Sequence, residues 1–350
     1  MVEERDMKQT QQRQSISILI PCHNEEAGVR ACIESCLNQT RKLDQIVVVD
    51  DASTDKSLAI LKEFGNKITL IALTKNMGNK SYVQEHGLQH ITSDIFIATD
   101  GDTILDPHFV EEIEKSFVDD KVIAAGGYIR SIKYNWITAI REIDYVVGQN
   151  IHKLAQSHMD SMLVIPGCAG AFRTSIFKKH ITFDHDTITE DLDFTYRFHR
   201  NGFKIAFNRN AIVWTQDPPT FHSYLNQMRR WYGGGWQNLR KHYGIVSSPL
   251  RAIEWSLIYV EGLVFSTLLL VMPLLNIKFF CLLLIPYALF DLAQALYTAW
   301  KSRRMDVIYY APLHLCMVFV NAYVFIEQFV KEIILRKRTM IWFKPLRVHI

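Results

Sequence analysis

The sequence has little cysteine and almost no excess of charge. Its six cysteines show neither a metal-ligand spacing nor the density of a disulfide framework, which fits a reducing compartment for the soluble part. The formal net charge is only +3, and so small a basic excess next to apolar segments argues against nucleic acid as a partner. Residues 1–14 are charged and Gln-rich. Because they have no apolar core they are not a signal peptide, and we expect a disordered lead-in.

Long apolar runs are absent up to Tyr243, where the sequence is mixed and polar, and they dominate from Trp255 onward. This asymmetry predicts a soluble part followed by a membrane part. We expect five segments: a lead-in at 1–14, a cytoplasmic domain at 15–216, interfacial amphipathic helices at 217–245, about three transmembrane helices at 255–330, and a basic tail at 331–350.

Strands and helices alternate with short connections from Ser15 to Gly126. Apolar runs predict strands at 16–20, 46–49, 68–73, 95–99 and 122–126, with helices between them. Such alternation predicts an α/β fold, in which a mostly parallel, nucleotide-binding sheet is flanked by helices. Acidic or polar clusters follow the first, second and fourth strands, and in a parallel sheet these clusters meet at one edge.

The fourth strand ends at two carboxylates, Asp100 and Asp102, separated by one glycine. Two acids at a strand end can hold a hard divalent cation, which can in turn bind a diphosphate. The alternative is an Asp-Gly turn that closes a hairpin.

A second acidic pair, Asp50-Asp51, follows the second strand. These residues can simply start a turn, with Ser53 or Thr54 capping the next helix. Two facing acidic pairs repel each other unless a cationic or hydrogen-bonding group lies between them. A uridine and a metal-bound diphosphate would satisfy both pairs.

The run Thr189-Glu190-Asp191 lies just before a predicted helix over 192–201. Thr189 can cap this helix, and acids in a first helical turn are favoured by the helix dipole. The other interpretation is chemical: opposite a metal–diphosphate site, a carboxylate can take the proton from an attacking sugar hydroxyl. With no second, nucleophilic carboxylate, the sequence predicts a single displacement with inversion.

Five sequence pieces together resemble the catalytic domain of processive, inverting nucleotide-sugar glycosyltransferases, the membrane synthases of cellulose, chitin, hyaluronan and poly-N-acetylglucosamine. The resemblance covers residues 15–240. Its pieces are Pro21-Cys-His-Asn24-Glu25-Glu26, Val48-Val49-Asp50-Asp51-Ala52-Ser53-Thr54-Asp55, Asp100-Gly101-Asp102, Thr189-Glu190-Asp191 and Gln227-Met-Arg-Arg230-Trp231.

The resemblance implies a GT-A-like fold and a role for each matching residue. It implies that Asp50 or Asp51 holds the uracil and ribose, that Asp100 lies along the nucleotide, and that Asp102 ligates Mg²⁺ or Mn²⁺ on the diphosphate. It implies that Asp191, next to Glu190, is the general base. Substrate contacts are further implied for Pro21, Asn24, Glu25, Gln227, Arg230 and Trp231. The family's Asn-x-Gly-Lys is here Asn76-Met77-Gly78-Asn79-Lys80, so Lys80 matches only with one inserted residue.

A run of small residues, Val164 to Arg173, includes Gly170. It is either a tight packing bend or, as the resemblance implies, a loop in which Gly170 lets the acceptor sugar approach the backbone.

Aromatic and basic residues recur at helical spacing from Thr220 to His242, which predicts helices in the membrane interface, broken at Gly233-Gly234-Gly235. Three spans follow, at 255–275, 279–300 and 307–330. The basic run at 301–304 predicts that the loop after the second span is cytoplasmic, as is the catalytic domain. A third crossing would place the basic tail outside, against the positive-inside tendency, and the sequence does not decide between an interfacial third run and an external tail.

These observations predict a multi-pass enzyme of the cell (inner) membrane that extends a β-linked glycan from a UDP-sugar. The resemblance favours UDP-N-acetylglucosamine, with a growing glycan as acceptor and the lipid bilayer as a partner. A homo-oligomer or an accessory export subunit is a further partner that the sequence leaves open. Two alternatives remain: a non-processive transferase that acts on a lipid carrier, and a non-catalytic subunit for polysaccharide export.

Overall fold

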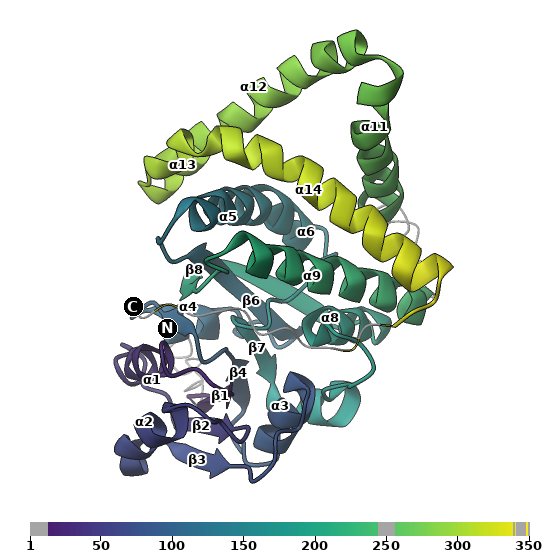
Figure 1. Cartoon of the computed structure of the whole chain (residues 1–350). Coiled ribbons are helices and arrows are strands. Elements are labelled where there is room, and N and C mark those ends of the chain that lie inside the picture. The colour runs from purple at the N-terminus through teal and green to yellow at the C-terminus, as the bar shows by residue number, and fades with distance from the viewer. Residues whose placement is uncertain (1–12, 244–255, 339, 341–347, 349–350) are drawn as a thin grey trace, which may run out of the picture.

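The computed structural model describes residues 13–243 and 256–338, together with 340 and 348. An eight-stranded sheet with the order β3-β2-β1-β4-β7-β6-β8-β5 forms its centre (Figure 1). The strands are β1 (Ile16–Cys22), β2 (Gln45–Asp50), β3 (Thr69–Ala72), β4 (Ile95–Ala98), β5 (Thr103–Leu105), β6 (Val122–Ser131), β7 (Gly170–Arg173) and β8 (Lys204–Thr215). The predicted α/β fold is therefore present.

Helices cover both faces of this sheet. Those of the soluble part are α1 (Val29–Leu37), α2 (Ser57–Glu63), α3 (Lys80–Leu88), α4 (Phe109–Lys115), α5 (Trp136–Val147), α6 (Leu154–His158), α7 (Thr174–Ile176), α8 (Glu190–Arg200) and α9 (Phe221–His242). Two apolar clusters form the core, one on each face, and alternate residues of β1 enter different clusters: Ile18 packs in one and Leu19 in the other. A strand buried on both faces must be apolar throughout, which explains the run 16–20.

The sheet is mixed rather than uniformly parallel. Strands β1 to β4 pair in parallel, β7 is antiparallel to both β4 and β6, and β6 pairs in parallel with β8. The sequence analysis did not predict β5, β7, β8 or α5. In particular Gly170 begins β7 at the centre of the sheet, where the sequence suggested a loop. The cap expected for the second helix is also wrong, because α2 begins at Ser57 and Asp55 accepts the Ser57 N–H at 2.9 Å.

The helix α9 is one continuous element from Phe221 to His242, so the break expected at the three glycines is wrong. The glycines serve packing. A Cβ atom added to Gly233 would lie 3.0 Å from Gln328 Oε1, and one on Gly235 would lie 3.3 Å from the Tyr259 hydroxyl. Glycine is used here because neighbouring elements pass close to the helix backbone.

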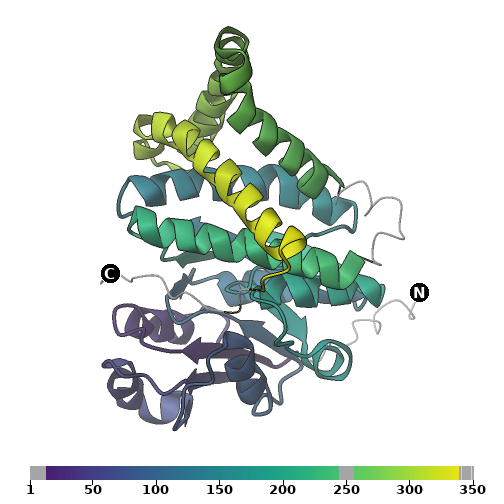
Figure 2. The ribbon, with the colours of Figure 1, turned by 45° about the vertical axis from the view of Figure 1, so that its right-hand side comes forward.

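Three helices are long and apolar enough to cross a membrane, at Ile258–Leu275, Ile277–Ser302 and Ala311–Ile334. They comprise the π-helical turn η5 (Ser256–Val260), α11 (Glu261–Leu275), α12 (Ile277–Ser302), α14 (Ala311–Phe329) and η6 (Val330–Ile334), with the short α13 (Asp306–Tyr309) between α12 and α14. Helices α11 and α12 form a hairpin that projects from the domain, whereas α14 lies across α5 and α9 (Figure 2). Among the described residues, three candidate spans agree with the sequence prediction.

Candidate functional site

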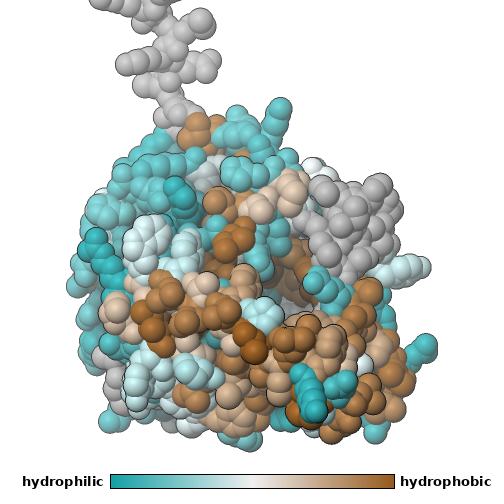
Figure 3. All heavy atoms as spheres, turned by 90° about the horizontal axis from the view of Figure 1, so that it is seen from above, coloured by the Kyte–Doolittle hydropathy of each residue, from teal (hydrophilic) through white to brown (hydrophobic). Residues whose placement is uncertain are grey.

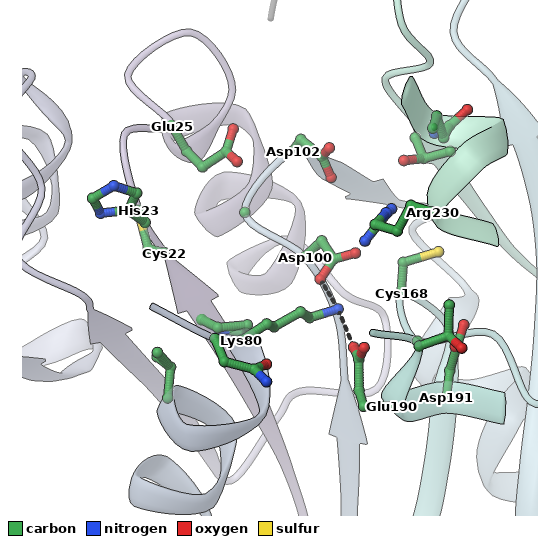
Figure 4. A pocket seen from close by; sticks show the side chains of 18 of the residues that line it. Cys22, His23, Glu25, Lys80, Asp100, Asp102, Cys168, Glu190, Asp191 and Arg230 are labelled. Atoms are coloured by element: carbon green, nitrogen blue, oxygen red, sulfur yellow. Dashed lines mark ion pairs between the residues drawn. The ribbon is translucent and has the colours of Figure 1, made fainter. Parts of the chain in front are cut away.

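A cavity of about 590 Å³ opens at the carboxyl ends of β1, β2 and β4. Parallel pairing of these strands brings their polar ends together, as expected for an open α/β sheet. Twelve of the fourteen residues singled out in the sequence line it: Pro21, Asn24, Glu25, Asp51, Lys80, Asp100, Asp102, Glu190, Asp191, Gln227, Arg230 and Trp231. Figure 4 shows the acids and Lys80 converging on one space.

Lys80 bridges two acids from different parts of the chain. It begins α3, and its Nζ lies 2.6 Å from Asp100 Oδ1 and 3.0 Å from Glu190 Oε1 (Figure 4). Burial alone would lower the pKa of Lys80, but the two carboxylates outweigh it and raise the pKa well above its usual value. The extra residue before Lys80 therefore does not remove it from the site, because Asn79 caps α3 and directs its first turn at the cavity.

Glu190 and Asp191 have opposite electrostatic environments although they are adjacent. Burial opposes ionisation of Glu190, but Lys80 outweighs it and lowers the pKa. Burial, followed by the charge of Glu190, raises the pKa of Asp191 to about 6. Asp191 Oδ1 accepts the Leu192 N–H at 2.9 Å. Of the two, Asp191 is therefore better suited to take a proton near neutral pH.

The Asp100–Asp102 turn can accommodate a divalent cation. Asp102 is only 4% exposed. Burial raises the pKa of Asp100 although the charge of Lys80 opposes the shift, and the charge of Asp102 adds to the rise. Seven carboxylates but only two Lys or Arg side chains line the described part of the cavity. Carboxylate oxygens suit Mg²⁺ or Mn²⁺. No group of three or more His, Cys, Asp or Glu able to hold a metal occurs among the described residues, so further ligands would have to come from a diphosphate or water.

The two aspartates after β2 differ in position. Asp51 lines the cavity, and its Oδ1 accepts the Met77 N–H at 2.7 Å. Asp50 is fully buried, does not line the cavity, and accepts the Ser53 N–H at 3.2 Å through Oδ2. Either residue was a candidate for the nucleotide from the sequence, and of the two only Asp51 lines the cavity. Asn24 orders this loop, because its side-chain oxygen accepts the Thr54 N–H at 2.7 Å.

Gly170 is the other residue that does not reach the cavity. It lies in β7, where an added Cβ would be 2.8 Å from the Phe172 ring, so its role is packing. The small residues that do face the cavity are Gly167 and Cys168. An added Cβ on Gly167 would lie 3.5 Å from both Asp191 Cβ and Lys80 Nζ. The expectation that Gly170 lies in a loop at the cavity is therefore wrong, and the small residues at the cavity belong to the preceding turn.

One wall of the cavity is formed by α9. Gln227 is 8% exposed, and its Oε1 has no hydrogen-bond partner among the described residues. The guanidinium carbon of Arg141 lies 4.7 Å from the centre of the Trp231 ring, a cation–π distance. One ring face of Trp231 is thus occupied by a protein group.

Sequence reasoning missed Tyr145 and Asp217, which also line the cavity. Asp217 Oδ1 accepts hydrogen bonds from the Tyr145 hydroxyl at 3.0 Å and Arg141 Nε at 3.4 Å. The signal available was an aspartate two residues after the end of β8, but that strand was itself unpredicted.

Thr189 and the two acids after it are held by α9. Asn238 Nδ2 donates to the Thr189 hydroxyl oxygen at 3.0 Å, and Gln237 Oε1 accepts the Ile188 N–H at 3.1 Å. Thr189 occupies the cap position of α8 without a side-chain cap bond among the described residues. Its side chain therefore serves the contact with α9 rather than the predicted cap.

Residues 13–234 match the family model described as Glycosyltransferase like family 2. A probable glycosyltransferase, YdaM, of Bacillus subtilis is 30% identical over 63% of this chain and 54% of its own length. A poly-beta-1,6-N-acetyl-D-glucosamine synthase of Staphylococcus epidermidis is 26% identical over 67% of this chain and 57% of its own length. The chain thus spans about half the length of these curated relatives.

A similar fold occurs in the mannosyltransferase PcManGT from Pyrobaculum calidifontis, solved in complex with GDP-Man and Mn²⁺. The two structures have a TM-score of 0.64 with 18% sequence identity, over 91% of this chain and 87% of that one. At this level of identity the similarity concerns the fold, and it includes the region after the α/β domain.

Proposed function

Since the chain belongs to glycosyltransferase family 2, we propose that it transfers a sugar with inversion from a UDP-sugar to a growing β-linked glycan. The observation that supports this most is the contrast between Glu190 and Asp191 in one cavity. Lys80 neutralises Glu190 at 3.0 Å, whereas burial raises the pKa of Asp191 to about 6. A nucleotide-sugar enzyme needs such a base opposite the anionic part of its donor.

In the proposed reaction Asp191 accepts the proton of an acceptor hydroxyl as its oxygen bonds to the anomeric carbon of the donor. The bond between that carbon and the diphosphate breaks, and UDP leaves with both electrons. Arg230 and Lys80, both lining the cavity, stabilise the developing charge. Asp102, with Asp100, would hold Mg²⁺ or Mn²⁺, which when bound supplies further positive charge at the diphosphate. A single base with no covalent sugar intermediate gives inversion.

We propose UDP-N-acetylglucosamine as the donor, supported by the poly-N-acetylglucosamine synthase among the relatives. Asp51 and Asn24 lie where the nucleoside would sit, and Gln227 and Trp231 face the acceptor. The three candidate spans support attachment to the cell membrane, with the catalytic domain in the cytoplasm where nucleotide sugars are made. A single transfer to a lipid carrier is the alternative that this architecture also supports.

Purified membranes containing the protein should be incubated separately with radiolabelled UDP-N-acetylglucosamine, UDP-glucose and GDP-mannose, and the products sized. We expect label from UDP-N-acetylglucosamine in long polysaccharide. Label confined to a single sugar on lipid would favour the carrier transferase instead, and another donor in the product would correct the sugar. If no UDP-sugar gives more UDP release than it gives with the Asp191→Asn control, the result would contradict the enzyme assignment and favour an export subunit.

A further inference from the structure

Helix α14 and the turn η6 that continues it contact the soluble domain along almost their whole length. His314 Nε2 lies 3.1 Å from Asp144 of α5, the Tyr224 hydroxyl of α9 donates to Asn321 Oδ1 at 2.8 Å, and Gln237 Nε2 donates to Glu332 Oε1 at 3.1 Å. Between these positions, Arg229 Nε lies 2.8 Å from Glu327 Oε2, and the rings of Trp236 and Phe325 are 5.1 Å apart. From residue 314 to residue 332 the helix rises about 27 Å.

Because these contacts extend over nearly the whole helix, α14 cannot cross a bilayer while it remains packed on α5 and α9. Positions 314, 321, 325 and 332 are seven, four and seven residues apart, so they lie on one face of the helix, and this face packs on the domain. The opposite face carries exposed apolar and aromatic side chains, including Leu313 and Tyr323. Figures 1 and 2 both show α14 lying over α5 and α9.

Both ends of α14 are on the side of the catalytic domain. Before it, Arg304 Nη1 donates to the Ser131 carbonyl at 3.1 Å, and Arg130 Nη2 donates to the Ser302 carbonyl at 3.3 Å. After it, Met340 lines the cavity of the candidate site. A helix that crossed the membrane would have its ends on opposite sides.

The α11–α12 hairpin contacts the domain only near its base, where the Tyr259 hydroxyl donates to the Gly235 carbonyl at 3.1 Å and Ala295 of α12 packs with Ala139 of α5. Its tip lies far from the domain, and Leu274 and Leu275 are 85% and 75% exposed. Apolar side chains gather on the face that these helices present with α14 (Figure 3). A lipid bilayer is the partner that covers such a surface, because α11 with its preceding turn and α12 are each long enough to span the hydrocarbon.

We propose that only the α11–α12 hairpin crosses the bilayer, and that α14 lies in the interface between the membrane and the catalytic domain. The residues after α14 are then on the catalytic side. This arrangement places two basic segments, Lys301 to Arg304 and Lys331 to Arg338, on one side, which the positive-inside rule favours. It thereby removes the conflict that three crossings create. The proposal does not depend on the donor or on catalysis.

Cysteine variants provide the test, in a background in which the exposed Cys281 and Cys316 and the cavity-lining Cys168 are replaced by serine and only the buried Cys22, Cys32 and Cys36 remain. Lys121→Cys marks the catalytic domain, Lys278→Cys marks the hairpin tip, and Lys337→Cys marks the segment after α14; all three lysines are exposed. Each is labelled with a membrane-impermeant maleimide in intact spheroplasts and in inverted vesicles. Labelling in detergent establishes that every thiol can react.

We expect Lys337→Cys and Lys121→Cys to react from the same side and Lys278→Cys to react from the other. Labelling of Lys337→Cys from the side of Lys278→Cys would show that α14 crosses, and would overturn the proposal. Labelling of all three thiols from one side would overturn the crossing of the hairpin. We expect Lys337→Cys to take up at least about tenfold more label in inverted vesicles than in intact spheroplasts.

Discussion

The backbone of α9 at Gly234 packs directly against the side chain of Thr189, the residue that precedes Glu190 and Asp191. A Cβ added to Gly234 would lie 2.5 Å from Thr189 Cγ2 and 2.9 Å from its Cβ. Overpacking of this kind costs about 1–3 kcal/mol, and here the strain falls on the segment that positions Asp191. We expect Gly234→Ala to lower kcat by about tenfold or more while the affinity for the donor changes little, measured by turnover and by calorimetry.

Gly148 provides a matched control. It too is in a helical segment, but no described atom lies within 4 Å of an added Cβ. Gly148→Ala should therefore leave kcat unchanged and should keep or slightly raise the melting temperature. Equal activity of Gly234→Ala and Gly148→Ala would mean that the contact with Thr189 does not position the acids.

The bridge formed by Lys80 should stabilise the protein without ligand. Lys80→Met keeps the length of the side chain but leaves Asp100 and Glu190 facing each other, and loss of one partner of a buried pair costs about 3 kcal/mol. We expect a lower melting temperature. The double variant Lys80→Met/Glu190→Gln should recover part of the loss, because one of the two like charges is gone. If the double variant is no more stable than Lys80→Met, the bridge is not what holds these acids.

The activity should depend on pH through Asp191. Burial raises the pKa of this carboxyl to about 6, so the base is protonated and inactive below that value. We expect kcat/KM to rise with pH through about 6 and then to level off. The free energy of unfolding should change in the opposite direction. Because the pKa of Asp191 is higher in the folded than in the unfolded protein, Asp191 contributes to stability at low pH, and this contribution is lost as pH rises through about 6. A kcat/KM that is flat between pH 5 and 7 would exclude Asp191 as the titrating base.

Transfer should depend on a divalent cation that Asp102 would hold. We expect both chelation and Asp102→Asn to abolish transfer, while Asp102→Asn leaves the melting temperature nearly unchanged, because relief of repulsion from Asp100 offsets lost polar contacts. Asp120→Asn is the control, since the Asp120 side chain is 97% exposed and is not part of the cavity lining. Full activity of the wild type in excess chelator would refute a metal-dependent reaction.

The sequence predicted well those features that depend on local pattern. The runs 16–20 and 95–99 are apolar because β1 and β4 are buried on both faces, and the acids that follow them converge because the strands are parallel. Lys80 was placed among the site residues, and the structure gives it two ionic partners there. The predictions that were wrong concern features that depend on contacts with residues distant in the sequence. Nothing near Gly170 shows that it pairs between β4 and β6.

The three glycines and α14 illustrate the same limit. Gly233-Gly234-Gly235 resembles a helix break, yet the helix continues because Thr189, Tyr259 and Gln328 pack against its backbone. A hydropathy pattern gives α14 the length of a span, but its contacts with α9 and α5 join residues that are 97 and 170 positions apart in the chain. Asp50 and Asp51 are indistinguishable in sequence, and only the register of β2 decides which one faces the cavity.

The central claim is that Asp191 is the general base, and one paired measurement on Asp191→Asn tests it. Binding of the UDP-sugar by calorimetry and turnover are measured on the same preparation. We expect binding close to that of the wild type, because the donor contacts proposed here involve Asp51, Lys80, Asp100 and Asp102. Turnover should fall at least about a hundredfold, because asparagine cannot take the proton. Turnover within about threefold of the wild type would contradict the account and would direct attention to Glu190.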